Sequence, residues 1–214
     1  MAVLVGCGGS SLPSYGVPQG NVMSEAEAGD GDLISYRTLT RADFQGKAPT
    51  GPAEKHADKV GAQTFALVKH DPGVGFEGKE RQLANGDREI RGKIKRLFFR
   101  AWMDRSRSWW NPKPGQAPDS YVLQHEQIHF ALVEIEAGKM NVEGRSLMQR
   151  TFEAESSQEM QKDIEEAINE IVKEGMDRLL ERSLEFDEDT SGRYEPVKQN
   201  EWYQRVQREL GAKR

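Results

Sequence analysis

Residues 121–132 read YVLQHEQIHFAL, and the spacing of their apolar residues predicts a buried α-helix. Proline, aspartate and serine at 118–120 favour a helix start just before it, and Gly138 lies near the expected end. We therefore predict a helix from Tyr121 to about Lys139.

The same segment carries a metal-binding pattern. His125 and His129 are four residues apart, so they lie about one turn apart on the same helix face. Two imidazoles placed in this way can bind one zinc ion, and Glu126 occupies the position that acts as general base in H-E-x-x-H proteins. The alternative is two ordinary histidines of a buried helix with a solvated glutamate between them. Because a chance match in such a chain is on the order of one in a hundred, the pattern favours a metal site with Zn2+ as cofactor.

Strands are expected before this helix and further helices after it. The expected strands cover residues 34–39, 64–68 and 89–95, the last continuing toward Trp102, with a polar, glycine-rich loop or hairpin connection over 73–88. The expected later helices are a long one over roughly 144–184 and a shorter amphipathic one after Pro196. Strands first and helices afterwards is typical of an α+β fold with helices on one face of a small antiparallel sheet.

The amino-acid composition excludes several classes of protein. The chain has 214 residues, with 30 Lys and Arg against 35 Asp and Glu, so its formal net charge is −5. That balance argues against a dedicated nucleic-acid-binding protein, because phosphate recognition needs a basic face. The sequence contains no apolar run of the roughly 18 residues that a membrane-spanning helix needs. One cysteine excludes both an intramolecular disulfide framework and a cysteine-rich zinc ribbon, so any metal must be held by His, Asp or Glu.

The first 32 residues differ in composition from the rest of the chain. Residues 1–32 are rich in glycine and poor in large apolar side chains, which predicts a disordered tether, followed by a single domain over 33–214. The run from Leu4 to Cys7 resembles the cleavage box of bacterial lipoproteins. That resemblance implies membrane attachment through a lipidated Cys7; the alternative is a free cysteine in a loose tail.

A wider resemblance starts from the HEQIHF motif at 125–130, followed by Glu134. The motif resembles a bacterial family of secreted zinc-dependent proteases. Further matches to that family occur in order along the chain: LTRADFQG at 39–46, SRSWW at 106–110, FDEDT at 186–190, then Gln199 and Trp202. The resemblance spans about residues 33–210 and implies a zincin-like fold, in which a small antiparallel or mixed sheet packs against the H-E-x-x-H helix and a long carboxyl-terminal helix. It also implies a peptide or protein substrate.

The sequence offers three candidates for the third zinc ligand. A catalytic zinc takes three protein ligands and keeps one open position, yet no histidine follows His129. The family has His-Gly shortly after its threonine, where this chain has serine, glycine and arginine at 191–193. Asp187 matches the family's acidic position and is the expected ligand. Asp189 is a near neighbour, and Glu155, 26 residues beyond His129, matches the spacing of proteases that use a glutamate.

Four other residues have secondary assignments. Tyr194 is the candidate for stabilising an oxyanion, because it is close to Asp187 in the sequence. Glu136 lies on the histidine face but is about 10 Å further along the helix, so it is expected to hold a loop rather than a metal. His56 and His70 are expected to be surface histidines.

Basic and aromatic residues are interleaved over Arg88–Arg107. Such a stretch can bind single-stranded nucleic acid or an anionic surface, or it can be a strand with a charged outer face. The alternation of charged with apolar residues favours the strand, so no nucleic-acid partner is expected. An edge strand here could pair with an extended peptide substrate.

The leading hypothesis is a zinc metallopeptidase of the bacterial cell envelope, whether periplasmic, outer-membrane or secreted. In it, His125, His129 and Asp187 bind zinc and Glu126 activates water. One alternative is an envelope lipoprotein that acts as a binding module and has a structural or degenerate zinc site. Another is a metal hydrolase that cleaves a different ester or amide.

Overall fold

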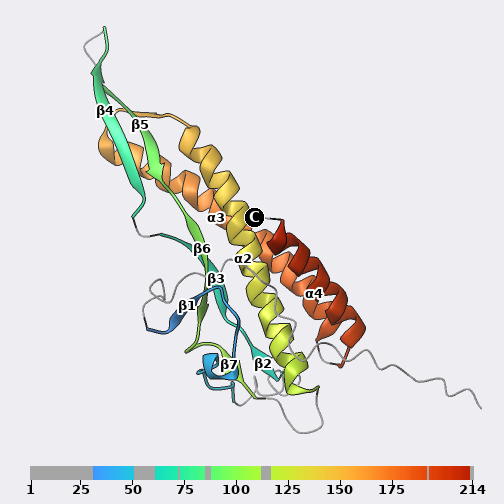
Figure 1. Ribbon diagram of the computed structural model, residues 1–214. Coiled ribbons are helices and arrows are strands. Elements are labelled where there is room, and N and C mark those ends of the chain that lie inside the picture. Colours follow the sequence, from blue (N-terminus) through green and yellow to red (C-terminus); the bar gives the residue numbers. More distant parts are fainter. Residues whose placement is uncertain are drawn as a thin grey trace, which may run out of the picture.

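The computed structural model describes residues 31–50, 61–71, 73–84, 88–111, 117–191 and 193–212. Nearly all of the tether predicted over 1–32 lies outside these residues, as do Cys7 and His56. The elements in order are β1 (Leu33–Ser35), the 3-10 helix η2 (Arg41–Asp43), β2 (Ala62–Gln63), β3 (Ala66–His70), β4 (Gly75–Gln82), β5 (Arg88–Arg96), β6 (Phe99–Asp104), β7 (Trp109–Trp110), α2 (Asp119–Gln149), β8 (Phe152–Ala154), α3 (Ser157–Thr190) and α4 (Pro196–Gly211). Figure 1 shows an elongated molecule in which α2 and α3 run along most of its length.

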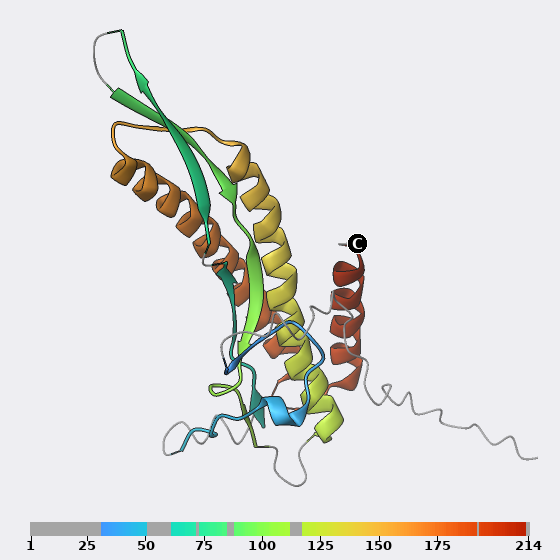
Figure 2. The ribbon, with the colours of Figure 1, turned by 60° about the vertical axis from the view of Figure 1, so that its left-hand side comes forward.

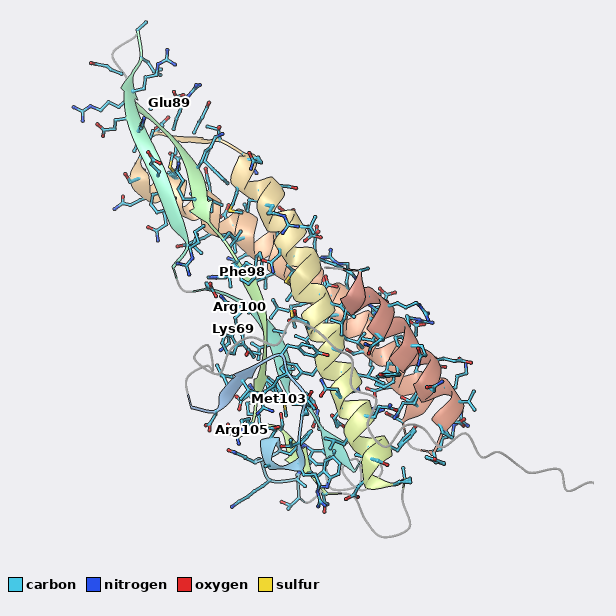
Figure 3. All side chains as sticks on the ribbon, in the orientation of Figure 1. Lys69, Glu89, Phe98, Arg100, Met103 and Arg105 are labelled. Atoms are coloured by element: carbon cyan, nitrogen blue, oxygen red, sulfur yellow. The ribbon has the colours of Figure 1, made fainter. Side chains whose placement is uncertain are left out.

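The predicted α+β class is confirmed. Within the described residues the strands form three small antiparallel sheets, with the orders β1-β6-β3, β2-β7 and β4-β5-β8. Along β6 the side chains alternate: Phe99, Ala101 and Met103 are buried, whereas Arg100 lies on the opposite face (Figure 3). The buried face packs against α2, so the core lies between this sheet and the helices.

The glycine-rich segment 73–88, expected as a loop or hairpin connection, contains the first strand of a hairpin. β4 occupies Gly75–Gln82 and pairs with β5 along its whole length. Cross-strand partners such as Lys95 and Glu77, whose charged atoms are 2.7 Å apart, stabilise this pairing despite the polar composition. The resulting hairpin projects from one end of the molecule (Figure 2).

The helix boundaries after residue 138 were predicted wrongly. α2 continues to Gln149, and the second long helix begins at Ser157 rather than at 144, with β8 between them. Gly144 lies inside α2 and is not a helix boundary. Its lack of a side chain lets α2 approach the sheet closely, since a Cβ there would lie 3.2 Å from the Phe99 ring. The start of α3 is fixed by Ser156, whose hydroxyl accepts a hydrogen bond from the backbone N–H of Glu159. The last helix after Pro196 is confirmed as α4.

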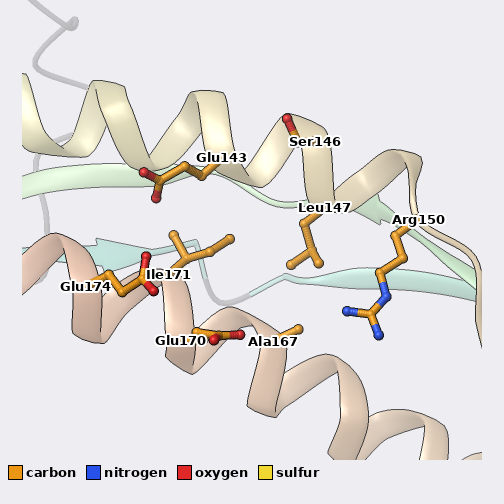
Figure 4. A pocket seen from close by; sticks show the side chains of 8 residues that line it. All are labelled: Glu143, Ser146, Leu147, Arg150, Ala167, Glu170, Ile171 and Glu174. Carbon is orange, nitrogen blue, oxygen red and sulfur yellow. The ribbon is translucent and has the colours of Figure 1, made fainter.

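α2 and α3 pack side by side and antiparallel. Near their middle, Gly175 of α3 faces the buried Met140 of α2. Towards the end of α2 and the start of α3, the two helices leave between them a groove of about 420 Å³ (Figure 4). The opposite end of the pair, where α2 begins and α3 ends, is covered by α4. No helix among the described residues is long and apolar enough to cross a membrane.

The segment that follows β1 is bound to α2 through the buried side chain of Gln127. Gln127 accepts a hydrogen bond from the backbone N–H of Leu39 at 2.7 Å and donates one to the carbonyl oxygen of Arg37 at 3.2 Å. Further along, the backbone N–H of Gly46 donates to the carbonyl oxygen of Ser108 at 2.8 Å. Two segments that are far apart in the sequence are therefore joined beside the H-E-x-x-H helix.

Candidate metal centre

Three potential ligand atoms converge where α2 and α3 meet. Nε2 of His125 and Nε2 of His129 are 3.1 Å apart. Oδ1 of Asp187, in the last turn of α3, lies 3.1 Å from Nε2 of His129 and 3.3 Å from Nε2 of His125. The structure therefore brings together the two histidines and the aspartate that the sequence selected.

This triangle has the size that a tetrahedral zinc ion requires. Ligand atoms about 2.0–2.1 Å from a tetrahedral zinc are about 3.3 Å from one another. The observed edges of 3.1, 3.1 and 3.3 Å are close to that value, so an ion just outside the plane of the three atoms can reach all of them. Two imidazole nitrogens and one carboxylate oxygen are donors that suit zinc, and three protein donors leave a fourth position open.

The charges of the cluster favour a cation. Burial alone would raise the pKa of Asp187, but the hydrogen bonds and charges of His125 and His129 hold it well below its usual range. Burial would lower the pKa of His129, but the hydrogen bond and charge of Asp187, together with the charge of Glu126, raise it above its ordinary value. Asp187 therefore stays anionic, and its Oδ1 also accepts a hydrogen bond from the hydroxyl of Ser191 at 2.8 Å.

A buried aromatic residue fixes the two imidazole rings. The ring of Phe186 stacks on His125, with centroids 4.5 Å apart and planes inclined by 26°. It meets His129 edge-on at 4.9 Å, and the ring of Trp202 in α4 packs against Phe186 itself, with centroids 5.3 Å apart. Phe186 and Trp202 are almost completely buried, so the rotamers of both histidines are constrained by packing.

Thr190 determines which nitrogen of His125 carries the proton. Its hydroxyl donates a hydrogen bond to the carbonyl oxygen of Phe186 at 2.6 Å, and its oxygen lies 3.2 Å from Nδ1 of His125. A hydroxyl has one proton to donate, so toward His125 it can only accept. Nδ1 of His125 therefore carries a proton, so that in a metal-bound state the lone pair of Nε2 would face the cluster.

Glu126 lies beside the cluster on the next face of α2. The residue is only 1% exposed, and no hydrogen bond or ion pair among the described residues involves its carboxylate. The hydroxyl of Thr64, between β2 and β3, lies 3.5 Å from its backbone carbonyl oxygen. Its charge acts on the neighbouring His129, so this buried carboxylate lies where a proton could be exchanged with a water molecule at the three potential metal ligands.

The other candidates for a third ligand lie elsewhere. Asp189 accepts a hydrogen bond from Nε1 of Trp202 at 2.8 Å and so joins α3 to α4. Glu155 precedes the opposite end of the 34-residue α3.

Tyr194, the candidate oxyanion donor, packs its ring on Tyr121 at 5.0 Å and is 54% exposed. His70 is an exposed residue at the end of β3, as expected.

Glu136 was expected to hold a loop, but it holds a helix. Its carboxylate accepts a hydrogen bond from Nε of Arg178 at 2.9 Å, and Arg178 also binds Glu143. Because Glu136 is nearly fully buried, this pair joins α2 to α3 about two turns beyond the histidines.

Phe186 and Thr190 belong to the site, although the sequence pattern predicted no role for either. Both stand in the FDEDT segment, where Phe186 precedes Thr190 by four residues and therefore shares a helix face with it. A helix over this segment would have been the useful signal, but the predicted helix stopped at Leu184. Gln199 was likewise matched without a role; its side chain donates to the carbonyl oxygen of Tyr121 at 2.9 Å.

Comparisons of the chain with protein-family models, with curated proteins and with solved structures found no match. The function is therefore argued from the geometry of the cluster.

Proposed function

We propose that this chain is a zinc-dependent metallopeptidase of the bacterial cell envelope with a zincin-like fold. The observation that carries the proposal is the convergence of His125, His129 and Asp187 beside the buried carboxylate of Glu126. Catalytic zinc sites have three protein ligands and an open position, whereas structural sites are closed by a fourth ligand. Among the described residues, no fourth His, Cys, Asp or Glu joins the cluster, which favours catalysis over the binding-module alternative.

His125, His129 and Asp187 would hold the metal in this proposal. A zinc ion bound there would polarise the carbonyl group of the scissile bond and lower the pKa of a coordinated water to about 7. Glu126 accepts a proton from the attacking water and returns it to the leaving amine. Phe186 and Thr190 keep the imidazoles oriented, because the first packs on both rings and the second fixes the tautomer of His125.

A peptide substrate is supported by the neighbouring sheet. The stretch Arg88–Arg107, which was expected to contain an edge strand, forms β5 and β6, and both are interior strands of their sheets. β3 is the edge strand instead, and the segment that leads into it lies beside Glu126. A free strand edge can pair with an extended peptide through backbone hydrogen bonds. The cell-envelope location rests on the resemblance of the run from Leu4 to Cys7 to a lipoprotein cleavage box.

The test combines metal content with peptide hydrolysis. Zinc is measured by elemental analysis in the wild type, Glu126→Gln and His129→Ala, and each protein is incubated with a mixture of unstructured peptides whose products are read by mass spectrometry. We expect stoichiometric zinc in the wild type and in Glu126→Gln, little zinc in His129→Ala, and cleavage only by the wild type. A wild type that takes up no zinc would overturn the metal site. Zinc without cleavage would favour a structural zinc in a binding module.

A further inference from the structure

The three members of the candidate metal centre are unequally exposed to solvent. The side chain of Asp187 is 43% exposed, whereas that of His129 is 18% and that of His125 is 7% exposed. Solvent thus reaches Asp187 more easily than either histidine, and a molecule that approaches the three ligand atoms along α3 meets the side of that helix that carries Asp187.

That side of α3 carries two exposed leucines. Leu184 is three residues before Asp187 and Leu180 is seven before it, spacings that place all three side chains along one side of the helix. Leu184 is 53% exposed and Leu180 is 60% exposed. The other large apolar side chains of this helix are buried or pack against the core, among them Met160, Ile164, Ile168, Leu179 and Phe186.

We propose that Leu180 and Leu184 form an apolar wall that selects peptides with a large apolar side chain next to the scissile bond. This inference rests on the proposed peptidase function and names the substrate class of the same site. Two leucines one turn apart at the solvent-accessible approach to the metal would bury such a side chain, which removes apolar surface from water on both partners.

The charges around the wall act in the same direction. Glu181 and Glu188, three residues before and four after Leu184, are exposed and flank it on the helix surface. An acidic substrate side chain placed against Leu184 would be repelled by both. The expected order of preference is therefore apolar, then neutral polar, then acidic.

The experiment compares matched peptides. A peptide that the wild type cleaves next to leucine is synthesised with that leucine or with serine in its place, and kcat/KM is measured for each. We expect the wild type to prefer leucine by about tenfold to a hundredfold and the double variant Leu180→Gln/Leu184→Gln to lose most of this preference. Val142→Gln, an equally exposed apolar position on α2, should keep it. An unchanged preference in the double variant, with zinc content intact, would overturn the proposal.

A binding measurement separates this inference from the peptidase proposal. Zinc-loaded Glu126→Gln is titrated with the fluorescein-labelled leucine and serine peptides, with and without the two leucine substitutions, and fluorescence anisotropy is recorded. Leucine-dependent binding that the substitutions abolish supports the apolar wall even if the wild type cleaves no peptide, a result that would overturn the peptidase function alone. Equal binding of both peptides to Glu126→Gln would overturn the wall.

Discussion

The hydroxyl oxygen of Thr190 lies 3.2 Å from Nδ1 of His125, while its proton is donated to the carbonyl oxygen of Phe186. One side chain thus fixes the tautomer of a potential metal ligand that stands 65 residues earlier in the chain. Partners of this kind orient a ligand nitrogen and raise its basicity without touching the metal.

Replacing Thr190 should therefore weaken metal binding without removing a ligand. Thr190→Val keeps the shape of the side chain but removes the acceptor for Nδ1 of His125, so we expect the zinc affinity to fall by about tenfold to a hundredfold. Thr190→Ser keeps the hydroxyl and should stay close to the wild type. Competition with a fluorescent chelator measures both. If the valine and serine variants bind zinc equally well, Thr190 does not orient His125.

Alanine substitutions of the three candidates for the third ligand should have different effects on zinc content and stability. Asp187→Ala removes one of the three converging donors, so we expect it to lose most of its bound zinc. Asp189→Ala should keep zinc but lower the free energy of unfolding by about 1–3 kcal/mol, because Nε1 of Trp202 loses its acceptor. Glu155→Ala should change neither quantity. Elemental analysis and urea unfolding of the three variants measure these effects, and zinc loss in Asp189→Ala instead would move the ligand by two residues.

The comparison of sequence and structure explains why Asp187 could be found at all. The two histidines need only a local helix, and the spacing of four residues predicts their common face directly. The third donor, Asp187, stands 58 residues after His129, in a second helix that packs against the first. Spacing alone therefore could not choose among Asp187, Asp189 and Glu155. The order of matched segments favoured Asp187, and the register between α2 and α3 brings that residue to the histidines.

The errors in the fold have a common physical cause. Gly138 and Gly144 were interpreted as boundary residues because glycine weakens a helix. Both lie inside α2, and Gly144 allows close contact with the ring of Phe99. β4 was missed for a similar reason, since its residues are polar and its stability comes from pairing with β5 rather than from its own sequence. Tertiary contacts thus decided each case in which local preference was weak.

Gly46 is required by a close backbone approach. A Cβ at this position would lie 2.7 Å from the carbonyl oxygen of Ser106 and 2.9 Å from that of Ser108. Backbone atoms cannot rotate away as a side chain can, so we expect Gly46→Ala to lower the free energy of unfolding by about 1–3 kcal/mol. Gly73 has no heavy atom within 4 Å of the corresponding position, and Gly73→Ala should be neutral or slightly stabilising. Urea unfolding compares the two, and equal stability of both variants would contradict the close approach.

Asp43 is a nearly buried carboxylate that is charged in the folded state. Its two oxygens accept hydrogen bonds from the guanidinium of Arg37 at 2.6 and 3.0 Å, and the backbone N–H of Thr40 donates another at 2.8 Å. Burial alone would raise the pKa of this carboxyl, but the hydrogen bonds of Arg37 and Thr40 and the charge of Arg37 outweigh it and hold the pKa below its usual range. The unfolded chain therefore takes up the proton first as the pH falls. The stabilisation is fully present above the unfolded pKa of about 3.9 and is lost as the pH drops through the folded value.

Asp43→Asn should remove this contribution and its pH dependence together. At pH 7 we expect the free energy of unfolding to fall by about 1–3 kcal/mol, because a charge-assisted pair becomes a neutral contact beside Arg37. Between about pH 5 and 3 the wild type should lose stability more steeply than the variant, since only the wild type releases the proton of residue 43 on folding. Urea unfolding at several pH values measures both curves, with Glu181→Gln on the exposed side of α3 as a control that should follow the wild type. Parallel curves for the wild type and Asp43→Asn would show that Asp43 is not charged in the folded state, and the ion pair with Arg37 would then contribute nothing to the stability of the segment beside α2.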